Sequence, residues 1–185
     1  IGFIKSARNQ VLVISVATAL KPLLKNNIEP DFVIAIDPND DNIIYAGGIS
    51  GGLFNSIDAG NSWNRVQGYD DAVNDALNGN GSISISSIAV TDNGYIYVAT
   101  GGSIFNEQGL SSESSGITAG DGIWYSADEG LTFQQVAGTD GKDITKVVAD
   151  LNQENVIYYS GISNGVKRVT DLGSPESMSG LPVTT

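Results

Sequence analysis

The side chains best suited to bind a ligand or to catalyse a reaction are five carboxylates in polar stretches of the chain. Two carboxylic acids held across a cleft can cleave a glycosidic bond, one as general acid and the other as base or nucleophile. The chain has 21 acidic residues, and nothing in their spacing selects a pair, so no catalytic residue is assigned. Solvated acidic loops are the favoured interpretation. The candidate ligand positions in these loops are Asp70, Asp71, Asp75, Glu107 and Asp121.

The composition excludes several other kinds of chemistry. Cys and His are both absent, which removes thiolate nucleophiles, His general bases, disulfides and the usual zinc sites. A site that binds a substrate carboxylate with three arginines would need Arg8, Arg65 and Arg168 to converge. These residues lie in different segments, so such a site is disfavoured. The net charge of −12 disfavours nucleic acid and anionic membranes as partners, and no apolar run is long enough to cross a bilayer.

Two oxygen-rich turns raise the question of calcium. Asp37, Asn39 and Asp41 alternate as oxygen ligands could, and a second turn contains Asp75, Asn78 and Asn80. Neither turn has the Gly and distal Glu of an EF-hand loop, so ordinary turns capped by Asx side chains are favoured. We therefore expect no cofactor, with calcium as the weaker alternative.

One turn occurs twice in the chain, at residues 56–63 and 126–133. Both copies read Ser, any, Asp, any, Gly, any, Ser or Thr, aromatic, and both lie between short apolar segments. The Asp can accept hydrogen bonds from backbone N–H groups ahead of it, the Gly can adopt positive φ, and the aromatic side chain can fold back over the loop. The pattern predicts hairpin turns with a structural role, held by Ser56, Asp58, Gly60, Trp63, Ser126, Asp128, Gly130 and Phe133.

A strand pair joined by an Asp- or Asn-rich turn precedes each repeat and occurs three times, beginning near residues 33, 87 and 146. Each unit then reads as four short antiparallel strands that need neighbours on both faces, as the blades of a β-propeller do. Residues 69–84 and 103–120 are predicted to be loop inserts. The third unit is degenerate around Asp171, and residues 174–185 read as a loose tail.

The N-terminal residues have a different pattern. Residues 11–16 form a buried-type apolar run, residues 17–27 can be helical, and residues 32–36 are a second strand, which together indicate a βαβ unit. The predicted fold is therefore mainly β, with about three four-stranded blades of an incomplete propeller after a short β/α segment. The predicted divisions are 1–31, 32–173 and 174–185, and the remaining blades are expected outside this chain.

The repeats resemble the Asp-box, or bacterial neuraminidase repeat, propellers. The resemblance rests on the two repeated turns and on strand pairs such as residues 35–38 with 44–47. That superfamily includes sialidases, xyloglucanase-type glycoside hydrolases, sortilin-type receptors and many secreted bacterial proteins. The resemblance implies an extracellular or cell-surface location and a box that acts as a structural turn at the blade periphery.

Residues 19–24 and 28–37 resemble the motility accessory factor family and its pterin-pyrophosphokinase-like relatives. Members are linked to nucleotide-activated sugars or pterins and carry a Gly-Pro-Ser-type loop upstream, which does not occur here. The first hypothesis is a non-catalytic interaction scaffold that binds carbohydrate or protein through its loops. A propeller glycoside hydrolase using paired carboxylates is the second, and a nucleotide-sugar-linked glycosylation protein is the third.

Overall fold

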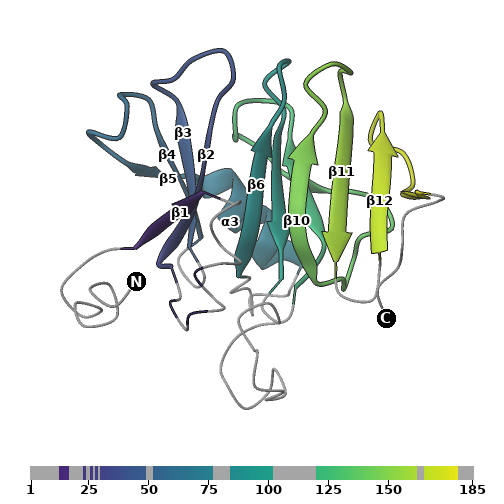
Figure 1. Ribbon diagram of the computed structural model, residues 1–185. Coiled ribbons are helices and arrows are strands. Elements are labelled where there is room, and N and C mark those ends of the chain that lie inside the picture. The colour runs from purple at the N-terminus through teal and green to yellow at the C-terminus, as the bar shows by residue number, and fades with distance from the viewer. Residues whose placement is uncertain are drawn as a thin grey trace.

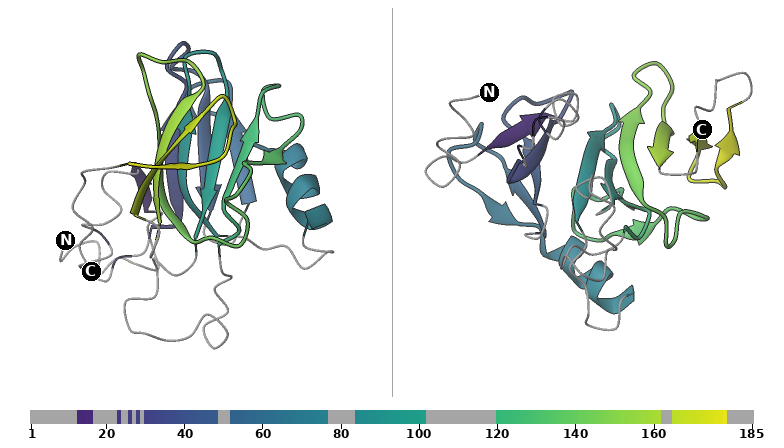
Figure 2. Two further views of the ribbon diagram at one scale, coloured as in Figure 1. Left: turned by 90° about the vertical axis from the view of Figure 1, so that its right-hand side faces the viewer. Right: turned by 60° about the horizontal axis from the view of Figure 1, so that its bottom comes forward.

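The computed structural model describes residues 13–16, 23, 26, 28, 30–48, 52–76, 84–101, 120–161 and 165–178. These residues form three separate β-sheets and one helix of ten residues, α3 (Gln67–Ala76). The sheets stand side by side like the leaves of a fan (Figure 1; Figure 2). Within the described part of the chain, no helix is long and apolar enough to cross a membrane.

Each sheet contains four antiparallel strands that follow one another in chain order, and we call these units blades 1 to 3. Blade 1 is β2 (Phe32–Ile36), β3 (Ile44–Gly48), β4 (Gly52–Ser56) and β5 (Asn64–Arg65). Blade 2 is β6 (Ile85–Val90), β7 (Ile96–Thr100), β8 (Ile123–Ser126) and β9 (Gln134–Gln135). Blade 3 is β10 (Ile144–Ala149), β11 (Val156–Gly161), β12 (Gly165–Thr170) and β13 (Glu176–Ser177). The predicted mainly β fold with three four-stranded blades is confirmed.

A further strand, β1 (Ile14–Val16), pairs in parallel with β2 and extends the first sheet. A parallel pair needs a crossover connection, as the predicted βαβ unit supplies. The helix predicted at residues 17–27 lies largely outside the described residues. The division at residue 32 stays a prediction, although β1 and β2 share one sheet.

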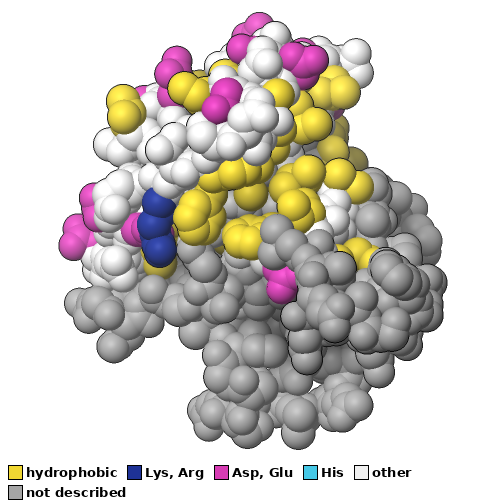
Figure 3. Space-filling view, turned by 90° about the vertical axis from the view of Figure 1, so that its left-hand side faces the viewer, with side chains coloured by type: hydrophobic (Ala, Val, Ile, Leu, Met, Phe, Trp, Pro, Cys, Tyr) yellow, Lys and Arg dark blue, Asp and Glu magenta, His cyan; other side chains and the backbone are white. Residues whose placement is uncertain are grey.

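The blades bury apolar side chains against one another. One core cluster lies between blades 1 and 2 and includes Val33, Leu53, Val98 and Trp124. A second lies between blades 2 and 3 and includes Tyr97, Ile144 and Ile157. The first strands of blades 2 and 3 pack on the preceding blade, since β6 contacts β2 and β3, and β10 contacts β6 and β7. The face of blade 1 that points away from blade 2 carries a patch of apolar side chains (Figure 3).

Two sequence predictions need correction. Residues 69–84 are predicted to be a loop, but residues 67–76 form α3, because Tyr69 and Val73 lie one helical turn apart and are both buried; residues 77–83 lie outside the described residues. Residues 174–185 are predicted to be a loose tail, but Glu176 and Ser177 within them form β13, which pairs with β12 and completes blade 3, while residues 179–185 lie outside the described residues. The second predicted insert, at residues 103–120, lies outside the described residues except for Gly120.

Candidate functional site

The two repeated turns have the same hydrogen-bond network. In the first turn, residues 56–63, the buried Ser56 hydroxyl donates to Asp58 Oδ1 at 2.8 Å and accepts the Gly60 N–H at 2.8 Å. Asp58 then accepts the Ser62 N–H at 2.8 Å and the Ser62 hydroxyl at 2.6 Å. A Ser hydroxyl and a carboxylate thus satisfy the backbone donors of a turn that closes β4 onto β5.

The second turn, residues 126–133, repeats these contacts. Ser126 Oγ donates to Asp128 Oδ1 at 2.7 Å and accepts the Gly130 N–H at 2.8 Å. Asp128 accepts the Thr132 N–H at 2.9 Å and the Thr132 hydroxyl at 2.6 Å. Hydrogen bonds from the side chain of Thr132 lower the pKa of Asp128, as those from Ser62 lower the pKa of Asp58. Both carboxylates are therefore committed to their own turns.

The third turn, around Asp171, is built differently. Asp171 and Leu172 both have positive φ, at 48° and 59°, and the Gly173 N–H donates to the Thr170 carbonyl at 2.9 Å. Two such central residues within this hydrogen bond are the signature of a type I′ hairpin turn. Val169 is the equivalent of Ser56 in blade 1 and Ser126 in blade 2. In each blade this residue of the third strand pairs with an isoleucine of the second strand. Without that hydroxyl, the shorter turn replaces the carboxylate network.

Helix α3 lies directly against the second turn. A Cβ on Gly68 would lie 2.2 Å from the Leu131 carbonyl oxygen, so only glycine allows this approach. Tyr69 packs edge-to-face on Phe133, with ring centroids 5.4 Å apart. Tyr69 is 2% exposed and Val73 is 4% exposed, so one face of the helix is anchored and the opposite face stays open to solvent.

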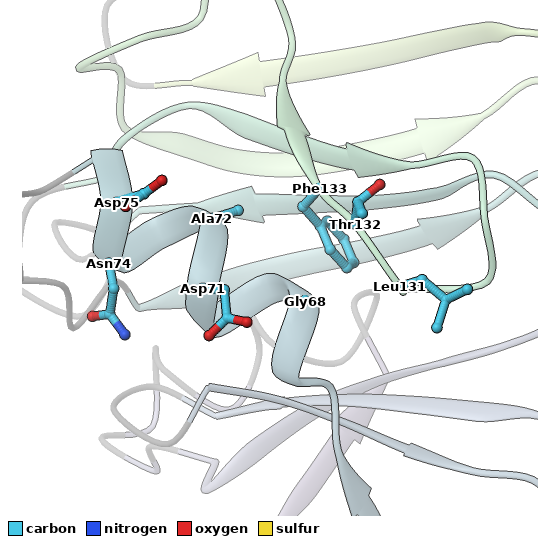
Figure 4. Close-up of a pocket in the computed structure, with 8 residues that line it drawn as sticks. All are labelled: Gly68, Asp71, Ala72, Asn74, Asp75, Leu131, Thr132 and Phe133. Carbon is cyan, nitrogen blue, oxygen red and sulfur yellow. The ribbon is translucent and has the colours of Figure 1, made fainter.

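A groove of about 720 Å³ runs between α3 and the second turn. Figure 4 shows the residues of α3 on one side and those of the turn on the other, with the Phe133 ring directed toward the helix. The helix wall is polar and the turn wall is largely apolar. The lining residues are Gly68, Asp71, Ala72, Asn74, Asp75, Leu131, Thr132 and Phe133.

The groove is acidic. Asp71 and Asp75 are exposed and lie one helical turn apart, and the lining includes no Lys or Arg. Gln67 Nε2 donates to Asp71 Oδ1 at 2.8 Å, which holds that carboxylate near the start of the helix. The lining therefore offers carboxylate and amide oxygens from one side, together with the Thr132 hydroxyl and the exposed Leu131 side chain from the other.

The predicted ligand residues separate into groups. Asp71 and Asp75 line the groove, but they lie on a helix instead of the predicted loop. Asp70 forms an ion pair with Arg65. Asp121 Oδ1 accepts the Gly141 N–H at 2.9 Å, so this carboxylate tethers a neighbouring loop. Glu107 lies outside the described residues.

The sequence did not single out Asn74, Leu131 or Thr132 as site residues. Thr132 was part of the turn motif, and Leu131 occupied a variable position within it. The signal that would have found Asn74 is the spacing of Tyr69 and Val73, which places one buried face on a helix and leaves Asn74 on the open one.

In the first turn considered for calcium, carboxylate oxygens accept hydrogen bonds from backbone N–H groups of the turn itself. Asp37 Oδ1 accepts the Asn39 N–H at 2.8 Å, and Asp40 Oδ1 accepts the Asn42 N–H at 3.0 Å. These are Asx turns. Among the described residues, no group of three or more acidic, Cys or His side chains is placed to hold a metal ion, and Asn78 and Asn80 lie outside that set.

Solved structures with similar folds are β-propellers. An ancestral GH74 enzyme matches with a TM-score of 0.51 and 23% identity, over 76% of this chain and 17% of that chain. YCF48 from Cyanidioschyzon merolae matches with a TM-score of 0.50 and 12% identity, over 77% of this chain and 35% of that chain. The chain thus spans a minor part of each neighbour's length and has the fold of propeller blades.

The N-terminal residues match a different family. Residues 1–51 match the family model described as 6-hydroxymethylpterin diphosphokinase MptE-like. This match agrees with the pterin-pyrophosphokinase-like resemblance of that segment and covers less than half of the chain. No curated protein matches the chain.

Proposed function

We propose that this chain is a non-catalytic binding part of a β-propeller protein and that the groove beside α3 holds a neutral carbohydrate. The observation that carries the proposal is the arrangement of Asp71, Asn74 and Asp75 along one wall of the groove. Carboxylate oxygens accept strong hydrogen bonds from sugar hydroxyls, and an amide both donates and accepts. An anionic sugar is disfavoured, since the lining contains no cation to pair with it.

The same arrangement argues for binding over cleavage. Glycoside hydrolysis needs two carboxyl groups on either side of the scissile bond. Here both carboxylates come from α3, and the facing wall supplies Leu131, Thr132 and Phe133, none of which can transfer a proton as a carboxyl group does. Phe133 is 7% exposed, so its ring supports the wall and is not a stacking platform for sugar.

The test is titration of the chain with neutral β-glucan and xyloglucan oligosaccharides, followed by calorimetry. The double variant Asp71→Asn/Asp75→Asn should weaken binding about tenfold, which corresponds to about 1.4 kcal/mol. The control Asp41→Asn/Asp140→Asn makes the same charge change at exposed positions away from the groove and should bind as the wild type does. Equal affinity in both double variants, or no binding of any neutral oligosaccharide, would contradict the proposal.

A basic, partly apolar protein segment is the second candidate ligand. Leu131 is 76% exposed at the rim of the groove, and the chain has a net charge of −12. An exposed leucine beside carboxylates suits a peptide with an apolar residue next to Lys or Arg. Binding of a Lys/Arg peptide should weaken steeply with added salt and with Leu131→Ser, whereas binding of a neutral sugar should change little with salt.

Three further proposals concern the protein as a whole. The sequence resemblance supports the proposal that the protein is an Asp-box propeller with an extracellular location, and periplasmic or surface labelling of the protein tests the location.

A glycoside hydrolase role is supported by the fold shared with the GH74 enzyme, and turnover of xyloglucan that one Asp→Asn change abolishes would establish it. A nucleotide-sugar or pterin role rests on residues 1–51, and titration with those compounds tests it.

A further inference from the structure

The outward face of blade 1 carries apolar side chains from the three strands β2, β3 and β4 and from the first repeat turn. We call this set, comprising Phe32, Ile34, Ile36, Ala46, Phe54 and Trp63, the first-blade outer face. Ile36 is 53% exposed and Trp63 is 41% exposed. A groove of about 160 Å³ between these side chains is lined by Ile14, Phe32, Ile34, Ala46, Phe54 and Trp63. The patch is visible as the yellow area in Figure 3.

Strand register shows what kind of partner this face fits. Ile34 pairs with Ala46, and Ala46 pairs with Phe54, in three adjacent strands. In blade 2 the residues at the same positions are Ile88, Val98 and Trp124.

These three side chains, together with Phe133 in the position of Trp63, are buried against blade 1. The first-blade outer face therefore has the side-chain pattern that, in blade 2, receives the preceding blade. This repetition indicates that its occupant is another blade.

The opposite end of the fan presents the complementary pattern. Ala35 and Tyr45 of blade 1 pack toward blade 2, and Ala89 and Tyr97 of blade 2 pack toward blade 3. The equivalent pair in blade 3 is Val148 with Tyr158, which faces outward. We call Lys146, Val148, Tyr158 and Val166 the third-blade outer face. Val148 is 46% exposed and Val166 is 39% exposed.

We propose that the third-blade outer face of one copy packs on the first-blade outer face of a second copy, and the reverse, so that two chains close a single ring of blades. Inside the chain, this type of face already meets its complement twice. Two copies of a three-bladed chain supply six blades, within the range of about four to eight that closed propellers use. The two-fold arrangement covers both outer faces and leaves no open end.

Charge supports contact between unlike ends. The chain has a net charge of −12, so two copies repel one another unless cations lie at the contact. Lys146 pairs with Ser160, which in turn pairs with Val166. Arg168 pairs with Tyr158, which in turn pairs with Val148. Both cations therefore lie on the outward side of blade 3. Among the described residues, the first-blade outer face has one cation beside it, Arg65 in the register row of Phe54, and that guanidinium is already paired with Asp70.

The first test is the mass of the chain in solution, measured by sedimentation over a range of concentrations. The expected result is a two-chain species that Phe54→Glu and Val148→Glu each convert to one chain, with circular dichroism to show that the variants fold. A wild type that remains a single chain would overturn the proposal. So would open, growing assemblies, or a dimer that is sensitive to Phe54→Glu and insensitive to Val148→Glu.

The second test does not depend on variants with buried charge. The chain has no cysteine, so Ile34→Cys and Val148→Cys can be introduced without competing thiols. Mixing the two single variants under oxidation should give a mixed disulfide between chains and little homodisulfide. Ala35→Cys/Ile88→Cys, the equivalent pair inside one chain, calibrates the yield. Homodisulfide of Ile34→Cys in excess over the mixed product would overturn the proposal.

Discussion

Asp58 and Asp128 each hold a hairpin turn with both carboxylate oxygens. One oxygen accepts a Ser hydroxyl and a backbone N–H, and the other accepts the hydroxyl of Ser62 or Thr132. Every one of these hydrogen bonds favours the ionised carboxylate. The residues directly after these aspartates, Ala59 and Glu129, have positive φ, at 55° and 59°, so each turn also contains a strained backbone position at a residue other than glycine.

The lowered pKa values of Asp58 and Asp128 predict a loss of stability in acid. Because the folded pKa lies below the unfolded one, these groups contribute stability above about pH 4, and the contribution is lost as the pH falls through the folded pKa. The double variant Asp58→Asn/Asp128→Asn should therefore show a flatter decline in the free energy of unfolding between pH 5 and pH 2. Urea unfolding at several pH values measures it. An unchanged slope, relative to wild type and to Asp41→Asn/Asp140→Asn, would contradict the assignment.

Ser126 offers a prediction about the buried side of the same network. Its hydroxyl is 1% exposed, donates to Asp128 and accepts the Gly130 N–H at 2.8 Å. Ser126→Ala leaves a buried N–H without its acceptor and should cost about 1–3 kcal/mol of unfolding free energy. Ser56→Ala should behave alike, because its contacts are the same. The exposed control Ser174→Ala should change stability by less than about 0.5 kcal/mol, and a similar small effect of Ser126→Ala would refute the prediction.

At the scale of elements, the position of α3 depends on one missing side chain. Gly68 lies inside the helix, where alanine is ordinarily preferred by about 1 kcal/mol. A Cβ there would lie 2.2 Å from the Leu131 carbonyl oxygen and 2.7 Å from that of Gly130. Backbone atoms cannot move aside as a flexible side chain can, so packing should reverse the helix preference.

Gly68→Ala should accordingly lower stability by about 1–3 kcal/mol and displace α3 from the second turn. Thermal unfolding measures the first effect. Quenching or near-ultraviolet dichroism of Tyr69 beside Phe133 reports the second. Asn74→Ala, on the exposed side of the same helix, is the matched control and should be neutral or slightly stabilising. A stabilised Gly68→Ala protein would show that the helix does not dock as described.

The blades could be predicted from sequence because their signals are local. Strand pairs such as β2 and β3 are joined by a short Asp- and Asn-rich turn, and the repeated turn reports the next pairing. Helix α3 was missed because Gly68, Asp70, Asp71 and Asn74 are poor helix formers. β13 was missed because two polar residues carry no strand pattern, and only their pairing with β12 defines them.

The candidate groove could be predicted only in part. Asp71 and Asp75 were identified by their chemistry, which the sequence states directly. Their meeting with Leu131 and Thr132 depends on the packing of α3 against the second repeat turn, and no local pattern encodes a contact between segments so far apart. Asp70 and Asp121 have the same chemistry but are occupied by Arg65 and Gly141, which only the folded arrangement reveals.

At the scale of the molecule, the described residues form a row of blades in which blade 2 alone has a neighbour on both sides. In such repeat arrays, stability is approximately a sum of the units and their nearest-neighbour interfaces. Among the described residues, the two core clusters have no residue in common, with Leu53 in the first and Ile157 in the second. Each interface can therefore be weakened separately.

Leu53→Ala and Ile157→Ala form a matched pair for testing this independence, since both side chains are 0% exposed. Each truncation should cost about 2–5 kcal/mol, because it leaves a cavity in its own cluster. Hydrogen exchange should then accelerate mainly in β2 to β5 for Leu53→Ala and mainly in β10 to β13 for Ile157→Ala, with blade 2 the last to exchange in both. Equal acceleration in all three blades by either variant would mean that the array unfolds as one cooperative unit, so that the interfaces act together and not as separable contacts.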